Sequence, residues 1–316
     1  YIISLCMNIY NTNYQFLYCF DENYNKQAFT SMISLLENLE SPVEINIIHP
    51  DENLMKEVPL RILNHPKLIK LNIHNFINAG YDFPNIDDSH VSEATYYRLF
   101  IEDYIEKEVS FIVYLDADII CMQNPEEYLN KEIDTLSNSK NVLSVRTEKV
   151  VQSNDEVFKR LKLNQSYFNA GVMVINYERW LKDDITNNLL LELKKIEKAI
   201  NFWDQDVLNS YFNGEYNELN NYLNYDSQKF DDSIKGDIVF LHYIGSKKPW
   251  LTSGAFIKSA FLYHERYSDV YENRFHIVHK WKVGSIKELV YSVLNFSFFR
   301  IQNKASYLLH FMKSLL

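Results

Sequence analysis

Glycine is scarce in this chain, with seven glycines among 316 residues. Neither G-x-G-x-x-G nor G-x-x-x-x-G-K-[ST], the two common glycine-rich phosphate-binding patterns, occurs in the sequence. Such loops hold phosphate through backbone N–H groups that approach it closely. Their absence excludes a glycine-rich phosphate cradle, so any phosphate chemistry must depend on side chains and a metal ion.

Cysteine is also rare. The three cysteines, Cys6, Cys19 and Cys121, are odd in number and lack the spacing of a metal site. Two of them lie in apolar, strand-like runs. We therefore expect reduced core cysteines in a cytoplasmic protein.

Long apolar runs are missing too. No stretch of 18 apolar residues occurs, so the sequence predicts no transmembrane helix. Residues 1–7 are apolar but have no basic flank and no cleavage site, so we do not predict a signal peptide. The chain does not begin with methionine, which leaves the true start of the protein open.

The net charge of −10 is distributed unevenly. Residues 273–316 contain seven Lys or Arg and one Glu, a net charge of +6, whereas the first 272 residues carry −16. An acidic body argues against nucleic-acid binding, whose affinity comes largely from contacts with phosphates. The basic, aromatic C-terminal segment points instead towards an anionic membrane surface.

Apolar runs of strand length alternate with segments of helical periodicity over most of the chain. This alternation is typical of a mostly parallel sheet that is covered on both faces by helices. We therefore predict one α/β domain over residues 1–253. The expected strands are 15–20, 44–49, 68–74, 111–115, 141–145, 171–176 and 237–242, and the expected helices are 26–39, 51–63, 91–105 and 185–200.

The pattern changes near residue 254. Apolar residues within 286–294 and 301–312 form two helical stripes, and basic residues lie among them. A stripe of this kind either packs against a core or lies in a membrane interface, and the sequence leaves both possibilities open. We predict a helical C-terminal extension over residues 254–316.

The most informative stretch is the apolar run 111–115 followed by Asp116-Ala117-Asp118. Residues two apart on a strand point to the same side, and open α/β sheets bind ligands at the carboxyl ends of their strands. Two neighbouring carboxylates suit a Mg²⁺ or Mn²⁺ ion, which can in turn hold a diphosphate. Acidic residues after a strand also form ordinary turns, so the pair alone does not decide.

Five further segments accompany this acidic pair. They are Phe20-Asp21-Glu22-Asn23-Tyr24, Tyr97-Arg98-Leu99, Tyr167-Phe168-Asn169-Ala170-Gly171-Val172, Trp203-Asp204-Gln205-Asp206-Val207-Leu208-Asn209 and His242-Tyr243-Ile244-Gly245-Ser246-Lys247-Lys248-Pro249-Trp250. In these segments, and in their order, the chain resembles glycosyltransferase family 8. That family of retaining enzymes includes bacterial lipopolysaccharide galactosyl- and glucosyltransferases and glycogenin.

The resemblance runs from about residue 16 to residue 250. It implies a single GT-A type, Rossmann-like α/β domain with a mixed, mostly parallel sheet. The implied reaction moves glucose or galactose from UDP-glucose or UDP-galactose to a glycan acceptor, retaining the anomeric configuration and using a divalent metal. We further expect the protein to work in the cytoplasm, peripherally on the inner face of the membrane if its acceptor is lipid-linked.

The metal would be Mn²⁺ or Mg²⁺, held by Asp116, Asp118 and a neutral imidazole nitrogen of His242. A lone histidine is more often a core or surface residue, but the residues that follow this one favour a ligand. Gly245 allows close approach of the backbone to the phosphates, and Lys248 adds positive charge beside the departing diphosphate.

The resemblance places the uracil and ribose where the first strand ends, at Phe20, Asp21 and Asn23. Tyr24 offers a ring that can stack on the base. A plain Asp/Asn turn is the simpler interpretation of the same residues. The other residues implied to contact the donor are Arg98, Ala117, Asn169, Ala170, Asp204 and Gln205.

The implied catalytic residues are Asp204, Gln205 and Lys248. The resemblance places Asp204 on hydroxyls of the transferred sugar and Gln205 under the anomeric carbon, although Asp204 would also suit a helix N-cap. Since a glutamine amide is a poor nucleophile, we favour same-face attack, with the leaving phosphate oxygen accepting the acceptor's proton, over two inversions. Glu148 aligns loosely with an acid that lies near the acceptor in the family.

Parts of the sequence are compatible with three other functions. A phosphatase of the haloacid dehalogenase type expects Thr or Val soon after its second Asp, and Ile119-Ile120 fit this poorly. A sugar-nucleotide pyrophosphorylase needs a glycine-rich loop after the first strand, where residues 21–24 have no glycine. A catalytically silent glycan-binding module would differ from an enzyme in not turning over a UDP-sugar. The sequence does not choose between glucose and galactose and does not identify the acceptor.

Overall fold

The structure, a computed structural model, describes residues 14–78, 80–84, 92–148, 156–164 and 166–316. Residues 1–7, which include Cys6, lie outside the described residues. Cys19 and Cys121 are both buried and free, as expected of core cysteines.

The centre of the molecule is a seven-stranded sheet with the order β3-β2-β1-β4-β7-β6-β8. β1, β2, β3 and β4 pair in parallel, β7 runs antiparallel to both of its neighbours, and β6 pairs in parallel with β8. The predicted α/β fold with a mixed, mostly parallel sheet is therefore confirmed. The strands are β1 (Tyr14–Cys19), β2 (Val43–His49), β3 (Leu68–Asn75), β4 (Phe111–Leu115), β6 (Leu143–Thr147), β7 (Phe168–Asn176) and β8 (Asn217–Glu218).

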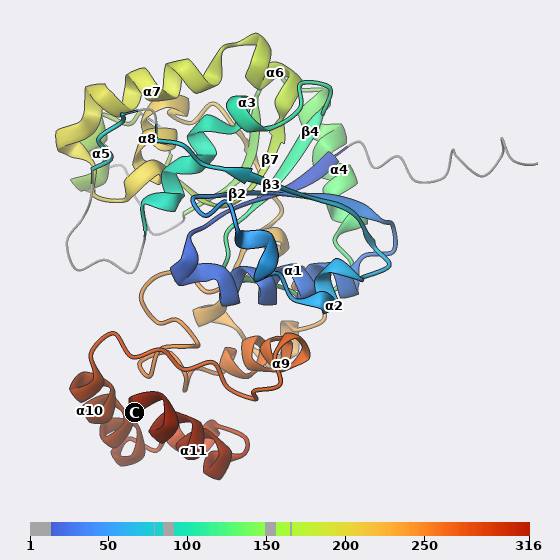
Figure 1. The fold of residues 1–316 in the computed structure, drawn as a ribbon. Coiled ribbons are helices and arrows are strands. Elements are labelled where there is room, and N and C mark those ends of the chain that lie inside the picture. Colours follow the sequence, from blue (N-terminus) through green and yellow to red (C-terminus); the bar gives the residue numbers. More distant parts are fainter. Residues whose placement is uncertain (1–13, 79, 85–91, 149–155, 165) are drawn as a thin grey trace, which may run out of the picture.

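Helices cover both faces of this sheet (Figure 1). One face carries α1 (Asn25–Asn38), α2 (Leu60–Leu63) and α4 (Glu126–Ser137), and the other carries α3 (Ile101–Tyr104), α6 (Tyr177–Lys182), α7 (Ile185–Ile196) and α8 (Trp203–Phe212). Alternate residues of β1 contribute to the two cores, Phe16 and Tyr18 to one and Leu17 to the other. A strand buried on both sides reads as a continuous apolar run, which is why β1 and β4 were recognisable in the sequence.

A second, three-stranded sheet has the order β5-β10-β9. It consists of β5 (Ile119–Cys121), β10 (Phe240–His242) and β9 (Tyr225–Asp226). The strand expected at 237–242 is therefore shorter than predicted and lies outside the main sheet. Because β10 pairs antiparallel with β5, His242 lies opposite Ile119 and next to the turn that follows β4.

Two helix predictions need correction. The segment 51–63 is not one helix but a 3₁₀ turn (Leu54–Lys56) followed by α2, because Pro59 lacks an N–H group and disfavours helical backbone before it. The segment expected as a helix over 91–105 is a 3₁₀ helix (Glu93–Phe100) that continues into α3, and the Ser92 side chain caps it by accepting a hydrogen bond from the Ala94 N–H. Val91 lies outside the described residues.

The C-terminal segment is helical, as predicted. α9 (Ala260–Val270) lies beside α1, and Arg266 on it pairs with Glu37 on α1 at 2.9 Å. α10 (Lys282–Leu294) and α11 (Lys304–Leu315) lie beyond α9, on the side away from the main sheet (Figure 1). Tyr307 and Phe311 of α11 form a small apolar cluster with Ala255, Phe256, Phe275 and Phe298, and Leu289 of α10 packs against it. None of the helices in the described ranges has both the length and the apolar character needed to cross a membrane.

Candidate functional site

A cavity of about 500 Å³ lies at the carboxyl ends of β1 and β4 and gathers residues from all the sequence motifs. Of the residues predicted to bind metal or donor, those that line it are Phe20, Tyr24, Arg98, Asp116, Ala117, Asp118, Asn169, Asp204, Gln205, His242, Gly245 and Lys248. Asp21, Asn23 and Ala170 were predicted with them but do not line this cavity.

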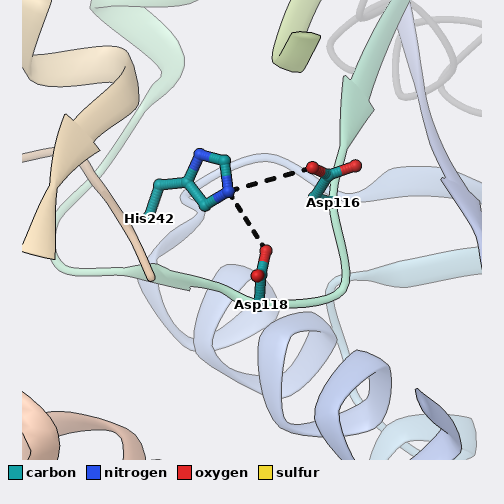
Figure 2. Close-up of side chains that lie close together, drawn as sticks. All are labelled: Asp116, Asp118 and His242. Atoms are coloured by element: carbon teal, nitrogen blue, oxygen red, sulfur yellow. Dashed lines mark ion pairs between the residues drawn. The ribbon is translucent and has the colours of Figure 1, made fainter. Parts of the chain in front are cut away.

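Figure 2 shows the three predicted metal ligands around one point. Asp116 and Asp118 follow β4, and His242 ends β10. His242 Nε2 lies 3.2 Å from Asp118 Oδ1 and 3.8 Å from Asp116 Oδ2. One ligand atom from each residue lies within 4.8 Å of the others. A set of two carboxylates and one imidazole is chemically suited to Mn²⁺ or Mg²⁺.

One feature of the three ligands favours a cation between them, and another holds them in position. Asp118 Oδ1 is buried and has no hydrogen-bond partner among the described residues. A buried, unsatisfied carboxylate oxygen is costly unless a cation compensates it. Main-chain hydrogen bonds fix the positions of the ligands: the Tyr243 N–H donates to the Asp118 carbonyl at 3.1 Å, and the Asp116 N–H donates to the Gly171 carbonyl at 2.8 Å.

Gly171 makes room for two of these ligands. A Cβ at this position would lie 2.1 Å from His242 Cε1 and 2.9 Å from Asp116 Oδ2. Real side chains do not approach so closely, so any larger residue would displace His242. Gly171 thus leaves the space that the two metal ligands need.

A relay of amides sets the tautomer of His242. The Gly171 N–H can only donate, and it donates to Asn169 Oδ1 at 3.1 Å. The Asn224 group that faces the same oxygen at 3.0 Å must therefore be its NH₂, which leaves Asn224 Oδ1 to face His242 Nδ1 at 2.9 Å. Since an amide oxygen only accepts, the Nδ1 atom carries the proton. The lone pair is then on Nε2, the atom that faces Asp116 and Asp118.

Lys248 lies against Asp118. Its Nζ atom contacts the Asp118 carboxylate and donates to the Tyr243 carbonyl at 2.7 Å, and the side chain is buried. Burial alone would raise the pKa of Asp118, but the ammonium group of Lys248 holds this pKa well below its usual value. Three residues before the lysine, Gly245 lines the cavity with φ of +78°, a left-handed conformation that favours glycine.

Arg98 joins the turn after β4 to the motif around Asp204. Its Nε atom contacts the Asp204 carboxylate, and its Nη2 atom donates to Asp204 Oδ1 at 3.0 Å. Its Nη1 atom donates to Asp116 Oδ1 at 3.2 Å and to the Ala170 carbonyl at 2.8 Å. Burial opposes the charge on Arg98, but Asp204, Tyr114 and Asp116 hold its pKa well above the ordinary value. Arg98 is buried, with only 5% of the residue exposed, so its contacts with Asp204 and Asp116 are not surface ion pairs.

Asp204 and Gln205 open α8, and their polar atoms are already engaged. The N-cap of α8 is Phe202, so the interpretation of Asp204 as an N-cap is wrong. Gln205 Oε1 accepts from the Ala170 N–H and its Nε2 donates to the Tyr167 hydroxyl, both at 3.1 Å. Both ends of the Gln205 amide are therefore fixed, and its orientation follows from the Ala170 donor.

The residues expected to hold the base form a turn. Asp21 accepts a hydrogen bond from the Asn23 N–H at 3.0 Å and caps the 3₁₀ helix Glu22–Tyr24, which is the simpler interpretation given above. Tyr24 lines the cavity and packs edge to face on Trp250, with ring centroids 6.1 Å apart. Of these three, only Tyr24 is placed to contact a ligand in the cavity.

Three residues that support the site were not singled out in the sequence. Tyr114 donates to Asp116 Oδ1 at 2.7 Å, and Asn224 orients His242. Asp206 is fully buried and accepts from the N–H groups of Asn201 and Phe202 at 2.8 and 2.9 Å. Asp206 thus fixes the loop that presents Asp204 and Gln205. An acid in the first turn of a helix often accepts hydrogen bonds from N–H groups that precede the helix. The position of Asp206 in the first turn of α8 was therefore the one sequence signal for its role.

Negative charge exceeds positive charge around the cavity. Among the described residues that line it, the acids are Asp116, Asp118, Glu148 and Asp204, and the cations are Arg98 and Lys248. Glu148 accepts from Asn169 Nδ2 at 3.2 Å, which places the predicted acceptor-side acid at this cavity. A bound divalent cation would offset the excess charge.

Comparisons with known proteins agree on one family. The family model described as "Glycosyl transferase family 8" matches residues 15–254. A lipopolysaccharide 1,2-glucosyltransferase of Escherichia coli is 28% identical over 247 residues, covering 73% of this chain and 71% of that protein. A lipopolysaccharide 1,3-galactosyltransferase of Salmonella typhimurium is 30% identical over 180 residues, covering 52% of this chain and 51% of that protein.

Solved structures show the same fold. The chain is similar to the galactosyltransferase LgtC, crystallised with donor and acceptor sugar analogues, with a TM-score of 0.67 and 19% identity. The match covers 86% of this chain and 99% of that one. This likeness shows that the fold is of the GT-A type.

The relay through Asn224 yields a prediction on metal affinity. Asn224→Leu removes the acceptor for the His242 Nδ1 proton, so the Nε2 lone pair is no longer held towards the carboxylates. We expect the Mn²⁺ dissociation constant, measured by isothermal titration calorimetry, to rise about 10- to 100-fold. Asn187→Leu, the same change at an exposed position on α7, should leave the affinity unchanged. Equal Mn²⁺ affinity in Asn224→Leu and the unaltered protein would contradict the relay.

Proposed function

Because the chain belongs to glycosyl transferase family 8, we propose that it transfers glucose or galactose from a UDP-sugar to a glycan acceptor and retains the anomeric configuration. The observation that carries this proposal is the convergence of Asp116, Asp118 and His242 beside Lys248, in a cavity large enough for a nucleotide sugar. The phosphatase alternative is overturned by the family match, and the intact metal ligands argue against a silent glycan-binding module.

Asp116, Asp118 and His242 would hold a Mn²⁺ or Mg²⁺ ion. When bound, that ion supplies positive charge to the diphosphate as the sugar leaves. Lys248 is buried beside Asp118, so its ammonium group remains near the ligands without solvent screening. Gly245 lets the backbone of the same loop approach the diphosphate. The cation and the loop together would stabilise the leaving group.

The sugar would lie between the turn after β4 and the start of α8. Asn169 and Gln205 present amide groups there, and Asp204 lies beside them, bound to Arg98. The Gln205 amide is held in one orientation by Ala170 and Tyr167, so we assign it a fixed place beside the sugar and no role as a nucleophile. We therefore retain same-face attack, in which an acceptor hydroxyl near Glu148 passes its proton to the leaving phosphate oxygen.

The sugar donor and the acceptor are proposed at the level of class. The relatives include a glucosyltransferase and a galactosyltransferase that act on lipopolysaccharide, by their names. For this chain we propose a hexose donor and a cell-surface glycan acceptor, with activity in the cytoplasm at the inner face of the membrane. Residues 1–253 would form the catalytic domain and residues 254–316 its helical extension.

A membrane-contacting role for the extension is supported by its exposed side chains. Large apolar residues that remain exposed on or near α10 and α11 are Trp281, Val283, Ile286, Val290, Tyr291, Val293, Leu294, Phe296, Phe299, Leu308, Leu309, Met312 and Leu316. The packing alternative would bury such a stripe, whereas the fully buried apolar residues of α10 and α11 in the small cluster are Tyr307 and Phe311. An exposed apolar surface carrying basic residues is suited to an anionic membrane interface.

The first test concerns metal-dependent turnover of the donor. Without an acceptor, we expect slow hydrolysis of UDP-glucose or UDP-galactose that stops in EDTA and returns with Mn²⁺. Asp118→Asn should lower this rate by at least about 100-fold because it removes a charged metal ligand. Asp134→Asn makes the same change at an exposed position of α4 and should leave the rate unchanged. Full hydrolysis in EDTA would contradict the metal site, and no turnover of any UDP-sugar would contradict the proposed activity.

The second test concerns the extension. The intact protein should co-sediment with vesicles containing phosphatidylglycerol, less so at high salt. The triple variant Arg300→Glu, Lys304→Glu, Lys313→Glu should bind these vesicles far more weakly, since each basic residue near the surface contributes about 1 kcal/mol. The control is a second triple variant, Lys107→Glu, Lys140→Glu, Lys198→Glu, which makes the same charge change on the catalytic domain. It should bind the vesicles like the unaltered protein. If the intact protein ignores anionic vesicles, the helices are purely structural.

A further inference from the structure

A second cavity of about 690 Å³ lies next to the first and shares none of its lining residues. Its walls come from α4, from the end of β6 and from the segment 218–229. Arg146, on β6, lines the second cavity, and Glu148, the residue directly after β6, lines the first. Tyr225, which lines the second cavity, directly follows Asn224, the residue that orients His242.

The acids of the second cavity are used to build its wall. Glu132 accepts a hydrogen bond from the Asn220 N–H at 3.1 Å. Glu218 accepts from the Thr147 N–H at 3.1 Å and also contacts the Thr147 hydroxyl. These carboxylates are therefore occupied by the protein itself. The cations that line the cavity are Lys131, Arg146 and Lys229.

Arg146 is the unusual member of this group. Its Nε atom is buried without a hydrogen-bond partner, and within the described ranges no ion pair reaches its guanidinium group. Burial lowers the pKa of Arg146, even though Glu148, Asp226 and Glu218 act in the opposite direction. A partly buried guanidinium with no anion on it is costly, and its planar fork matches a carboxylate or phosphate.

Tyrosine side chains also line this cavity and add apolar ring surface to it. The rings of Tyr222 and Tyr225 stack with centroids 6.5 Å apart and planes 19° apart, and Tyr128 adds a third ring to the lining. All three are half-buried, so each presents part of a ring face or edge. Tyrosines combine an apolar face with a hydroxyl group, which suits the mixed surface of a sugar ring. Asn220 and Asn221 add amide groups for its hydroxyls.

We propose that this cavity binds an anionic sugar of the acceptor glycan, one that carries a phosphate or a carboxylate, with Arg146 as its main contact. The proposal rests on the proposed function, since the acceptor's reacting hydroxyl would lie at Glu148 in the neighbouring cavity. The glycan would then extend from Glu148 past Arg146 to the tyrosines. Both cavities would be filled at once, one by the donor and one by the acceptor.

The test measures binding of small anionic sugars by isothermal titration calorimetry, with Mn²⁺ and UDP present in excess to fill the first cavity. The probes are glucose 6-phosphate, glucuronate and neutral glucose. We expect the anionic sugars to bind and glucose not to bind over the same concentrations. Binding of both anionic probes would show that charge alone is recognised, whereas binding of only one would identify the anionic group.

Variants then locate the binding. Arg146→Gln should weaken the anionic probe at least tenfold, and Lys107→Gln, a cation at the far end of β4, should leave it unchanged. Lys131→Gln, on the rim of the same cavity, should also weaken it, which keeps the test valid if Arg146→Gln proves less stable on thermal unfolding. Equal affinity in both cavity variants and the unaltered protein, or equal binding of glucose, would overturn the proposal. The donor-hydrolysis test above fails or succeeds independently of this binding.

Discussion

Four carboxylates around one cavity are the constraint on which the site depends. Asp116, Asp118, Asp204 and Glu148 would repel one another unless positive charge or hydrogen bonds compensate them. Arg98 compensates Asp204, Lys248 compensates Asp118, and Asn169 hydrogen-bonds Glu148. Asp118 Oδ1 remains without a hydrogen-bond partner among the described residues, and it faces His242 beside Asp116. The proposed cation would act between these three residues. Removing either basic residue would therefore disturb more than its own contact.

Residues that are distant in sequence from Asp116 and Asp118 hold the three metal ligands in place. Gly171 leaves the volume that His242 and Asp116 occupy, and its N–H begins the amide relay through Asn169 and Asn224. The antiparallel pairing of β10 with β5 brings His242 to the turn after β4. Backbone pairing thus sets the position of the imidazole, and the relay sets its tautomer.

The sequence predicted the sheet and the acidic pair because both are local signals: buried strands read as apolar runs, and the two carboxylates follow one such run directly. It did not predict Asn224 or Asp206 as site residues, because their partners lie in other elements and their role appears only when those elements meet. The helix expected at 51–63 is interrupted before Pro59, because the residue that precedes a proline disfavours helical backbone. His242 and Arg98 were assigned through family motifs, since no spacing in the chain relates them to Asp116.

The central claim is that the His242 imidazole and the carboxylates of Asp116 and Asp118 bind one divalent ion. Electron spin echo envelope modulation of the Mn²⁺-loaded protein tests it directly, because nitrogen coordinated to Mn²⁺ modulates the echo. The account predicts ¹⁴N modulation from one imidazole that disappears in His242→Ala. Mn²⁺ bound with no ¹⁴N modulation, or with modulation that persists in His242→Ala, would contradict it.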